Sequence, residues 1–453
     1  MKTECDRLVE QLSACGEAER GAPLGQLRKK PLLEICGSLG PRLCSAETVN
    51  GALLSLAECS IGRETITHQE VEVVLSFFLD KINTKKTFET SLYCLDLVIR
   101  DFSERSPCSL EMSSRLFSAL KGLEIEVQNC PTKIRRNVYT IFLYILTEAM
   151  VAKCGADDLS FILTSVDGES DPESVLMLFK INYAVCSFAN EAVFSEICVE
   201  FFDSVANYFP IIFTKPPDCR VTKEDLVCGL SKCMTSDKYA EHSVPFMLSR
   251  LSSPSAATKC EVVGELLRCV SVYSDALLAK YSRDIVKGVR DEILKLSAYT
   301  NNSENSPVNK CIVESLNLLK TLSKRVENVS EKSALDIFSP VVDGLLSSVD
   351  SQREVCSCYA TMVFDIISNS LVCCSAVGPY VLTMLAVSCE EEKISSNILL
   401  LFSSACGGIN NFIFNNKDIY QIMCEKLSRV RQIITALMTG VFKKCHEVGR
   451  LIL

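Results

Sequence analysis

The sequence predicts an all-α protein, a HEAT- or armadillo-type α-solenoid of roughly ten helix pairs. Three observations favour this fold class. Amphipathic helical stripes recur along the chain, and breaks recur about every twenty residues, so that helix pairs repeat about every forty. No convincing set of alternating strands joined by tight Asn-Gly hairpins is present. A chain of 453 residues is also too long for one compact core.

The first clear helix start lies at Thr67. Thr67 and Glu70 match a capping box, in which each side chain accepts a hydrogen bond from the backbone N–H of the other residue. An apolar stripe on one helical face follows, formed by Val71, Val74, Leu75, Phe78 and Ile82. After a polar break at residues 83–86, the stripe of the next predicted helix comprises Phe88, Leu92, Leu95 and Ile99.

Further helix starts follow along the chain. Asp171-Pro172-Glu173 places an N-cap, a proline at the first helical position and an acid in the first turn. Thr222-Lys223-Glu224-Asp225 matches another capping box. The stripes expected after these starts comprise Val175, Leu178, Ile181 and Val185, and then Leu226 and Leu230. Later stripes comprise Ile312, Leu316 and Leu319, and then Val342, Leu345 and Leu346.

The composition favours an ordered protein without catalytic machinery. Apolar residues make up 48% and charged residues 23%, and the net charge of −9 leaves no basic field for duplex nucleic acid. Histidine occurs only three times, which leaves little room for histidine-dependent proton transfer or metal ligation. No GxxxxGK[ST], HExxH or GxSxG motif occurs, nor GxGxxG after a strand. We therefore expect no enzymatic activity, cofactor, small-molecule substrate or direct nucleic-acid binding.

Twenty-five cysteines raise the alternative of a metal or cluster site. Cys356, Cys358, Cys373 and Cys374 lie about one helix apart, but no CxxC pair occurs and helical spacing points Cys356 and Cys358 in different directions. The start of the chain lacks the apolar core of a signal peptide, so a cytoplasmic and nuclear location with reduced thiols is expected. There, a free cysteine such as Cys94 serves as a small apolar residue in a helical stripe.

No membrane span is expected. The apolar stretch from Val138 to Ala152 contains Glu148 and is shorter than the roughly 20 residues that a span requires. The run from Tyr359 to Cys389 is longer but contains Asp365, Asn369 and Pro379. Buried helix pairs explain both stretches better.

Two charged segments each leave two interpretations open. Residues 167–171 faintly resemble a calcium loop, but they lack the alternating ligands and the final glutamate of that motif, so a helix-capping loop fits better. Near the C-terminus, Lys426, Arg429 and Arg431 form either a solvated helix face or a patch that docks a protein partner.

A proline-rich connection follows residue 208. Pro210 is expected to end a helix, and Pro216-Pro217 should hold the chain extended. Phe209, Ile211 and Phe213 are expected to pin this loop onto the repeats.

Two interpretations compete for this loop as well. It is either an architectural hinge between repeats or a contact surface for a partner, since unusually long loops often carry function. In the second case Lys215, Asp218 and Arg220 are the residues expected to point outward.

One block of sequence goes beyond generic repeats. It runs from DGESDP at residues 167–172, through FDSVANYFPI at 202–211 and FTKPPD at 213–218, to EDL at 224–226. In this order and spacing the block resembles the MMS-nineteen (Met-eighteen) family, with a resemblance that covers roughly residues 60 to 280. Family members are about twice as long as this chain, and residues 301–453 match no family motif.

The resemblance implies a HEAT-repeat scaffold of the cytosolic iron–sulfur protein assembly targeting complex. Its partners would be the other subunits of that complex and apo iron–sulfur proteins, including DNA repair and replication enzymes. On this view residues 1–60 are divergent helical repeats, residues 61–300 are the family-like N-terminal HEAT domain and residues 301–453 are further HEAT-like repeats. The alternatives are a generic HEAT scaffold outside iron–sulfur assembly and a cluster or metal carrier.

Overall fold

The computed structural model describes residues 3–16, 19–63, 66–103, 105, 108–298, 306–391, 395–416, 432 and 435. Every regular element in this part of the chain is a helix, and 22 of them are α-helices. The predicted all-α solenoid is therefore confirmed. The chain divides into two compact units, Met1–Cys233 and Met234–Leu453, each described by itself below.

The first unit contains the helices of the first half of the chain. They are α1 (Glu4–Ala14), α2 (Gly21–Leu27), α3 (Leu32–Leu43), α4 (Val49–Ser60), α5 (His68–Ile82), α6 (Phe88–Phe102), α7 (Leu110–Gly122), the 3₁₀ helix η2 (Val127–Asn129), α8 (Thr132–Ile145), α9 (Glu148–Val151), α10 (Ala156–Val166), α11 (Pro172–Phe188), α12 (Glu191–Ser195), α13 (Cys198–Ala206) and α14 (Lys223–Met234). Only the last residue of α14 belongs to the second unit.

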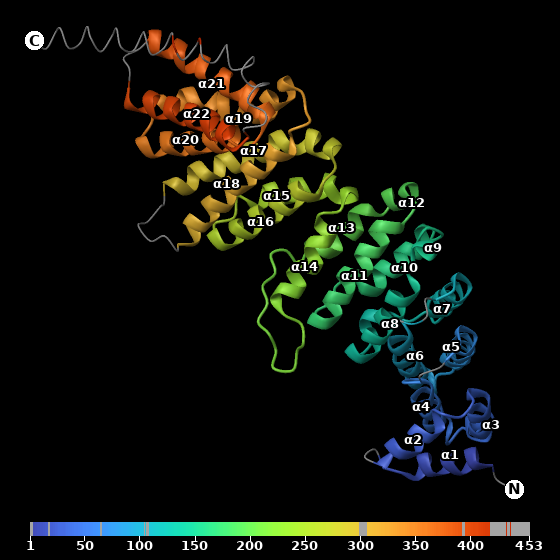
Figure 1. The fold of residues 1–453 in the computed structure, drawn as a ribbon. Coiled ribbons are helices and arrows are strands. Elements are labelled where there is room, and N and C mark those ends of the chain that lie inside the picture. The colour runs from blue at the N-terminus through green and yellow to red at the C-terminus, as the bar shows by residue number, and fades with distance from the viewer. Residues whose placement is uncertain are drawn as a thin grey trace, which may run out of the picture. The chain divides into compact units, whose positions relative to one another are not determined.

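The helices of the first unit stack in two layers (Figure 1). Helices α4, α6, α8 and α11 pack side by side in one layer, while α5, α7 and α9 form the other. The first-layer helices begin at residues 49, 88, 132 and 172, so successive starts are 39, 44 and 40 residues apart. This spacing confirms the predicted period of a HEAT-type array.

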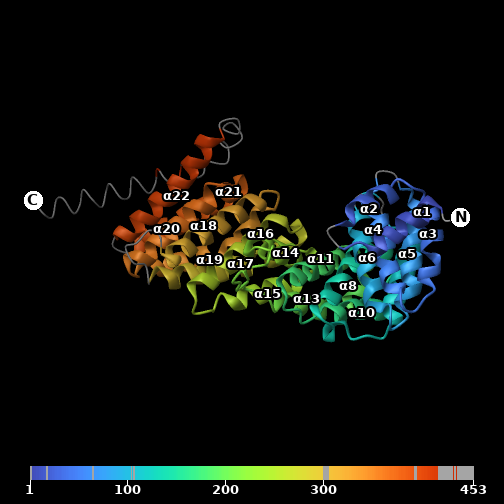
Figure 2. The ribbon, with the colours of Figure 1, turned by 90° about the horizontal axis from the view of Figure 1, so that it is seen from below.

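The second unit repeats the arrangement. Its further helices are η3 (Asp237–Tyr239), α15 (Ala240–Arg250), α16 (Ala256–Val272), α17 (Asp275–Ser297), α18 (Pro307–Arg325), α19 (Glu331–Val349), α20 (Arg353–Ile367), α21 (Leu371–Glu391) and α22 (Ser396–Asn415). Helices α16, α18, α20 and α22 form one row, which Figure 2 shows, and α15, α17, α19 and α21 form the second row.

Local sequence sets the helix starts as predicted. The Thr67 hydroxyl accepts from the Glu70 backbone N–H at 3.3 Å, and a Glu70 carboxylate oxygen accepts from the Thr67 N–H at 2.9 Å. Thr222 and Asp225 form the same reciprocal pair before α14. These bonds satisfy backbone N–H groups that the first helical turn leaves without a partner.

Most predicted stripes are buried. All five stripe residues of α5 and all four of α11 lie in the core. The prediction for α18 was wrong in register, because Ile312 and Leu316 are only half-buried. The buried face of α18 is instead formed by Cys311, Ser315, Leu318, Leu319, Leu322 and Ser323. In α19, Leu346 is 38% exposed, whereas Val342 and Leu345 are buried as expected.

Twelve cysteines in the described part of the chain are buried, as the apolar interpretation predicts, whereas Cys44 and Cys228 are exposed. Cys94, Cys356, Cys373 and Cys374 are fully buried, and Cys358 is half-buried. Burial raises the pKa of the Cys94 thiol to about 12 and that of Cys373 to about 11. Such thiols stay protonated at neutral pH, whereas the thiolate is the form that attacks electrophiles and ligates metals.

One helix in the described part of the chain, α22, is apolar and long enough to cross a membrane by length and composition alone. A third (33%) of its most apolar window is buried, and the helix packs against α20 and α21. Core helices of other proteins pass the same test.

Candidate protein-interaction site

An ion pair inside the first unit holds the loop between α10 and α11. Arg135 of α8 binds the Glu169 carboxylate through two parallel hydrogen bonds. Nε donates to Oε2 and Nη2 donates to Oε1, each at 2.8 Å. The Glu169 side chain has no accessible surface. Such two-pronged arginine–carboxylate pairs are stronger than neutral hydrogen bonds and fix the orientation of both groups.

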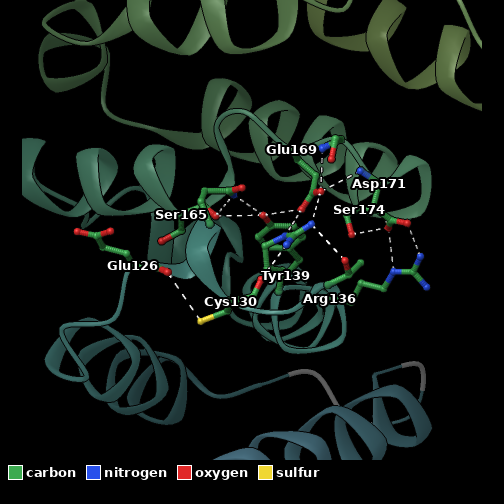
Figure 3. Close-up of polar contacts among 12 residues, drawn as sticks. Glu126, Cys130, Arg136, Tyr139, Ser165, Glu169, Asp171 and Ser174 are labelled. Atoms are coloured by element: carbon green, nitrogen blue, oxygen red, sulfur yellow. Dashed lines mark hydrogen bonds and ion pairs between the residues drawn. The ribbon is translucent and has the colours of Figure 1, made fainter.

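Two tyrosines complete the surroundings of Glu169. Figure 3 shows the contact from Tyr139. The Tyr139 hydroxyl of α8 lies 3.1 Å from Glu169 Oε2 and accepts from Gln128 Nε2 at 2.6 Å. Tyr208, just after α13, donates its hydroxyl to the Glu169 carbonyl at 2.6 Å. The Tyr208 ring packs edge-on against Phe179 of α11, with ring centroids 5.5 Å apart. The network therefore joins α8, α11 and the end of α13.

A second ion pair lies beside the first. Arg136 Nη2 lies 2.6 Å from Asp171 Oδ1, and its Nη1 lies 2.6 Å from Glu173 Oε2. Asp171 also accepts from the Ser174 backbone N–H at 3.0 Å, which caps α11 as predicted (Figure 3). Segment 167–171 is thus a helix-capping loop. No group of three or more acidic, His or Cys side chains in the described residues is arranged to hold a metal ion.

The network stabilises the ionised form of both carboxyl groups. Burial alone would raise the pKa of Glu169, but the hydrogen bonds from Arg135 and from the backbone N–H groups of Asp171 and Ser170 outweigh burial and lower that pKa. Burial would likewise raise the pKa of Asp171, but the hydrogen bonds from Arg136 and Ser174 outweigh burial, so this pKa is also lowered. Both carboxylates are therefore charged at neutral pH.

This network anchors the connection from α13 to α14. Phe209 and Ile211 at its start are buried, and so is Val221 at its end. The Arg220 backbone N–H lies 3.4 Å from Glu173 Oε1, so the C-terminal end of the loop contacts the start of α11. Both ends of the loop are thus fixed to the same group of helices.

Two details differ from the sequence prediction. Helix α13 ends at Ala206, before Pro210, because the chain leaves the helix through turns that place Tyr208 on the Glu169 carbonyl. Phe213 is only half-buried, so Phe209 and Ile211 pin the loop and Phe213 contributes less.

Between its anchors the loop projects from the helices (Figure 1). Ile212 is 92% exposed, which is unusual for a large aliphatic side chain held in a fixed loop. The predicted candidates Lys215, Asp218 and Arg220 are all exposed, as expected. The other three candidates, Lys426, Arg429 and Arg431, lie outside the described residues.

Two lysines, Lys180 and Lys215, lie near the Asp225 carboxylate. Asp225 accepts hydrogen bonds from the backbone and hydroxyl of Thr222, and these bonds, with the charges of Lys215 and Lys180, lower its pKa. Lys215 of the loop and Lys180 of α11 therefore lie within electrostatic reach of one carboxylate. Both lysines are exposed.

Sequence reasoning missed the partners in α8. Arg135 and Arg136 lie 34 to 37 residues before the acids that they bind, which is close to one repeat period. Two adjacent arginines one repeat before the DGESDP segment could therefore have predicted these ion pairs. Ile212 was also missed, because a lone isoleucine in a loop gives no sign of its exposure.

Two adjoining grooves lie along the layer of α5, α7 and α9 in the first unit. A groove of 860 Å³ between α5 and α7 is lined by polar residues that include Asp80, Glu111 and Arg115. An adjoining groove of 510 Å³ contains the ion pair between Lys121 and Asp158. Charges of both signs line these grooves.

Comparison with known families places the network and the loop in a matched region. Residues 43–295 match the family model MMS19_N, described as Dos2-interacting transcription regulator of RNA-Pol-II. This stretch contains both ion pairs and the whole loop.

Curated relatives agree with that match. The MMS19 nucleotide excision repair protein homolog of Danio rerio is 24% identical over 359 residues, which cover 76% of this chain and 32% of that protein. The Homo sapiens homolog is 26% identical over 228 residues, 49% of this chain and 21% of that protein. The DNA repair/transcription protein mms19 of Schizosaccharomyces pombe is 20% identical over 308 residues, 66% of this chain and 28% of that protein. The chain thus spans about a third or less of these relatives.

Solved structures resemble the chain only distantly. An engineered protein aligns with a TM-score of 0.42 and 13% identity, covering 91% of this chain and 99% of its own. Kap121p bound to Nup53p aligns with a TM-score of 0.40 and 11% identity, covering 92% of this chain and 42% of its own.

Proposed function

Because this chain belongs to the MMS19 family, we propose that it is a non-enzymatic adaptor of cytosolic iron–sulfur protein assembly. It binds other subunits of the targeting complex and apo-proteins that receive clusters, including DNA repair and replication enzymes. It works in the cytoplasm and nucleus, carries no cluster or other cofactor itself, and binds neither nucleic acid nor membrane directly.

The family and the names of its members support the repair side of this proposal. The relatives are named as nucleotide excision repair or DNA repair/transcription proteins. The resemblance to the family implies apo-protein clients among repair and replication enzymes, so an adaptor for cluster delivery would connect the two processes.

One observation supports the choice of contact surface. The Ile212–Arg220 loop lies within the family-matched stretch, and two buried or half-buried ion pairs hold its base in place. A hinge between repeats would need no exposed isoleucine and no row of exposed charged residues. We assign Lys215, Asp218 and Arg220 to this surface as partner contacts.

Affinity purification followed by mass spectrometry tests the proposal. The tagged full chain should enrich iron–sulfur assembly subunits and iron–sulfur enzymes over a tag control. A variant with Lys215, Asp218 and Arg220 changed to Ala should fold normally and lose some of those partners. Enrichment of unrelated transport or phosphatase proteins instead would support the alternative, a generic HEAT scaffold outside iron–sulfur assembly.

A further inference from the structure

The loop contains a stretch of backbone without internal partners. From Ile211 to Lys215 no backbone N–H or C=O takes part in a hydrogen bond within the described residues. The chain neither turns nor bends between residues 211 and 216, and it reverses only at Pro217 and Asp218, where the Cys219 N–H reaches the Pro216 carbonyl at 3.2 Å. Ile211 itself is buried, so the four residues from Ile212 to Lys215 offer free donors and acceptors along a segment without turns.

The side chains from Ile211 to Thr214 alternate in exposure as in a strand, and Lys215 is exposed as well. Ile211 is buried, Ile212 is exposed, Phe213 is half-buried and Thr214 is exposed. A period of two places alternate side chains on opposite faces. Isoleucine, phenylalanine and threonine also favour strands, so the composition of the segment and its exposure pattern over residues 211–214 both suit strand pairing.

The segment is held before any partner arrives. Phe209 and Ile211 fix its start in the core, and Pro216-Pro217 restricts the backbone at its end. A strand that is already extended loses less conformational entropy when it pairs with another strand.

We propose that Ile211–Lys215 is a docking strand that binds an extended peptide segment of a partner protein by backbone hydrogen bonds. This inference rests on the proposed adaptor role and specifies its mode of contact. The bound segment carries an apolar side chain opposite Ile212, which is 92% exposed. It carries an acidic side chain near the exposed ammonium group of Lys215.

A partner helix does not fit this surface as well. A helix satisfies its own backbone groups, so it would leave the N–H and C=O groups of Ile211–Lys215 unused. Exposed strand edges are templates for the addition of another strand, and this mode of recognition recurs in peptide-binding domains.

The probe is a displayed library of short random peptides, selected against the full chain. Two proline substitutions test the backbone. Thr214→Pro and Lys215→Pro each remove one N–H, and adjacent residues of a strand present their N–H groups to opposite edges. Whichever edge of the segment pairs with the peptide, one of the two proline substitutions therefore removes an N–H from that edge. The matched controls are Thr214→Val and Lys215→Ala, which keep the N–H, and thermal melting checks that all four variants fold.

We expect binders with alternating apolar and acidic residues. One of the two proline variants should weaken their binding by about fivefold or more, the value for one lost hydrogen bond of ~1 kcal/mol. Thr214→Val keeps the N–H and should therefore weaken binding less than Thr214→Pro, and Lys215→Ala should weaken only acidic peptides. Hydrogen exchange of residues 211–215 should slow when peptide binds.

Three results would overturn the docking strand. They are a selection that yields no binder, binders that tolerate both prolines, and slowed exchange only at other residues. Any of them would leave the adaptor role intact if the full chain still purifies with iron–sulfur assembly proteins. Conversely, a working strand on a chain that purifies with none of those proteins would refute the proposed function alone.

Discussion

At the scale of single residues, Glu169 is the group on which the site depends. Its carboxylate accepts from Arg135, from Tyr139 and from two backbone N–H groups, and its carbonyl accepts from Tyr208. A charge without accessible surface is tolerated only when it is paired and fully hydrogen-bonded. One side chain thereby determines how α8, α11 and the base of the loop meet.

Replacing Glu169 should be costly. Glu169→Gln keeps the shape of the side chain but leaves the Arg135 guanidinium without its counter-charge, and breaking a buried pair typically costs ~3–5 kcal/mol. We expect a loss of that order in the free energy of unfolding, measured by chemical denaturation. A variant as stable as the wild-type chain would show that the pair contributes little.

The same carboxyl group makes stability depend on pH. Its pKa is lowered in the folded chain, whereas an unfolded glutamate titrates near ~4.3. Its contribution is therefore fully present above that value and is lost as pH falls through the lower folded pKa. Glu169→Gln should flatten this part of the stability curve between about pH 5 and 3, and an unchanged slope would contradict the assignment.

Two sets of loop residues should behave differently. Phe213→Ala should lower stability by about 1–2 kcal/mol, less than the ~3–5 kcal/mol of a fully buried ring, because Phe213 is half-buried. Alanine at Lys215, Asp218 and Arg220 together should leave the melting temperature unchanged, since all three side chains are exposed. A thermally silent Phe213→Ala would instead make its ring a candidate binding anchor.

At the scale of elements, sequence predicted helix starts better than buried faces. Capping pairs such as Thr67–Glu70 are local chemistry, so four residues suffice to identify them. The buried face of α18 depends on how closely its neighbours approach. Cys311 and Ser315 face the core there, and an apolar count alone favoured Ile312 and Leu316.

Close approach between helices is testable at Gly344 of α19. A Cβ built there would lie 2.8 Å from Tyr359 Cζ of α20 and closer still to its hydroxyl oxygen. Gly344→Ala should therefore destabilise the second unit by about 1 kcal/mol, since overpacking costs ~1–3 kcal/mol and outweighs a helix-propensity gain of up to ~1 kcal/mol. The measurement is chemical denaturation.

The chain offers a matched control in α16. A Cβ at Gly264 would meet no atom within 4 Å, so Gly264→Ala should stabilise the protein by about 0.5–1 kcal/mol. Adding Tyr359→Phe to Gly344→Ala should recover part of the loss, because the two positions are in contact. Equal effects at both glycines would mean that α19 and α20 pack less closely than described.

For the molecule as a whole, the forty-residue period could be predicted from the sequence because it recurs along the chain. Each repeat buries its apolar face on the next, so the same pattern recurs and small errors in single helices do not change the fold. The ion-pair network around Glu169 could be predicted only in part. The DGESDP segment stands out in the sequence, but its partners Arg135 and Arg136 lie one repeat earlier and become neighbours only when the layers stack.

The cysteines make a molecule-wide prediction. Because Cys356, Cys373 and Cys374 are buried among apolar helices and their thiols are protonated, protein purified without oxygen should contain no stoichiometric iron or zinc. Elemental analysis measures this directly. Stoichiometric metal that disappears when Cys356, Cys358, Cys373 and Cys374 are changed to Ala would establish a cluster or metal carrier instead.

We propose that this chain helps iron–sulfur enzymes to acquire their clusters without holding a cluster itself. The most direct measurement is the incorporation of radioactive iron into repair and replication enzymes in cells that lack the chain. We predict that incorporation falls, that the wild-type chain restores it, and that the variant with Ala at Lys215, Asp218 and Arg220 restores it less well. Unchanged incorporation in cells without the chain would contradict the claim.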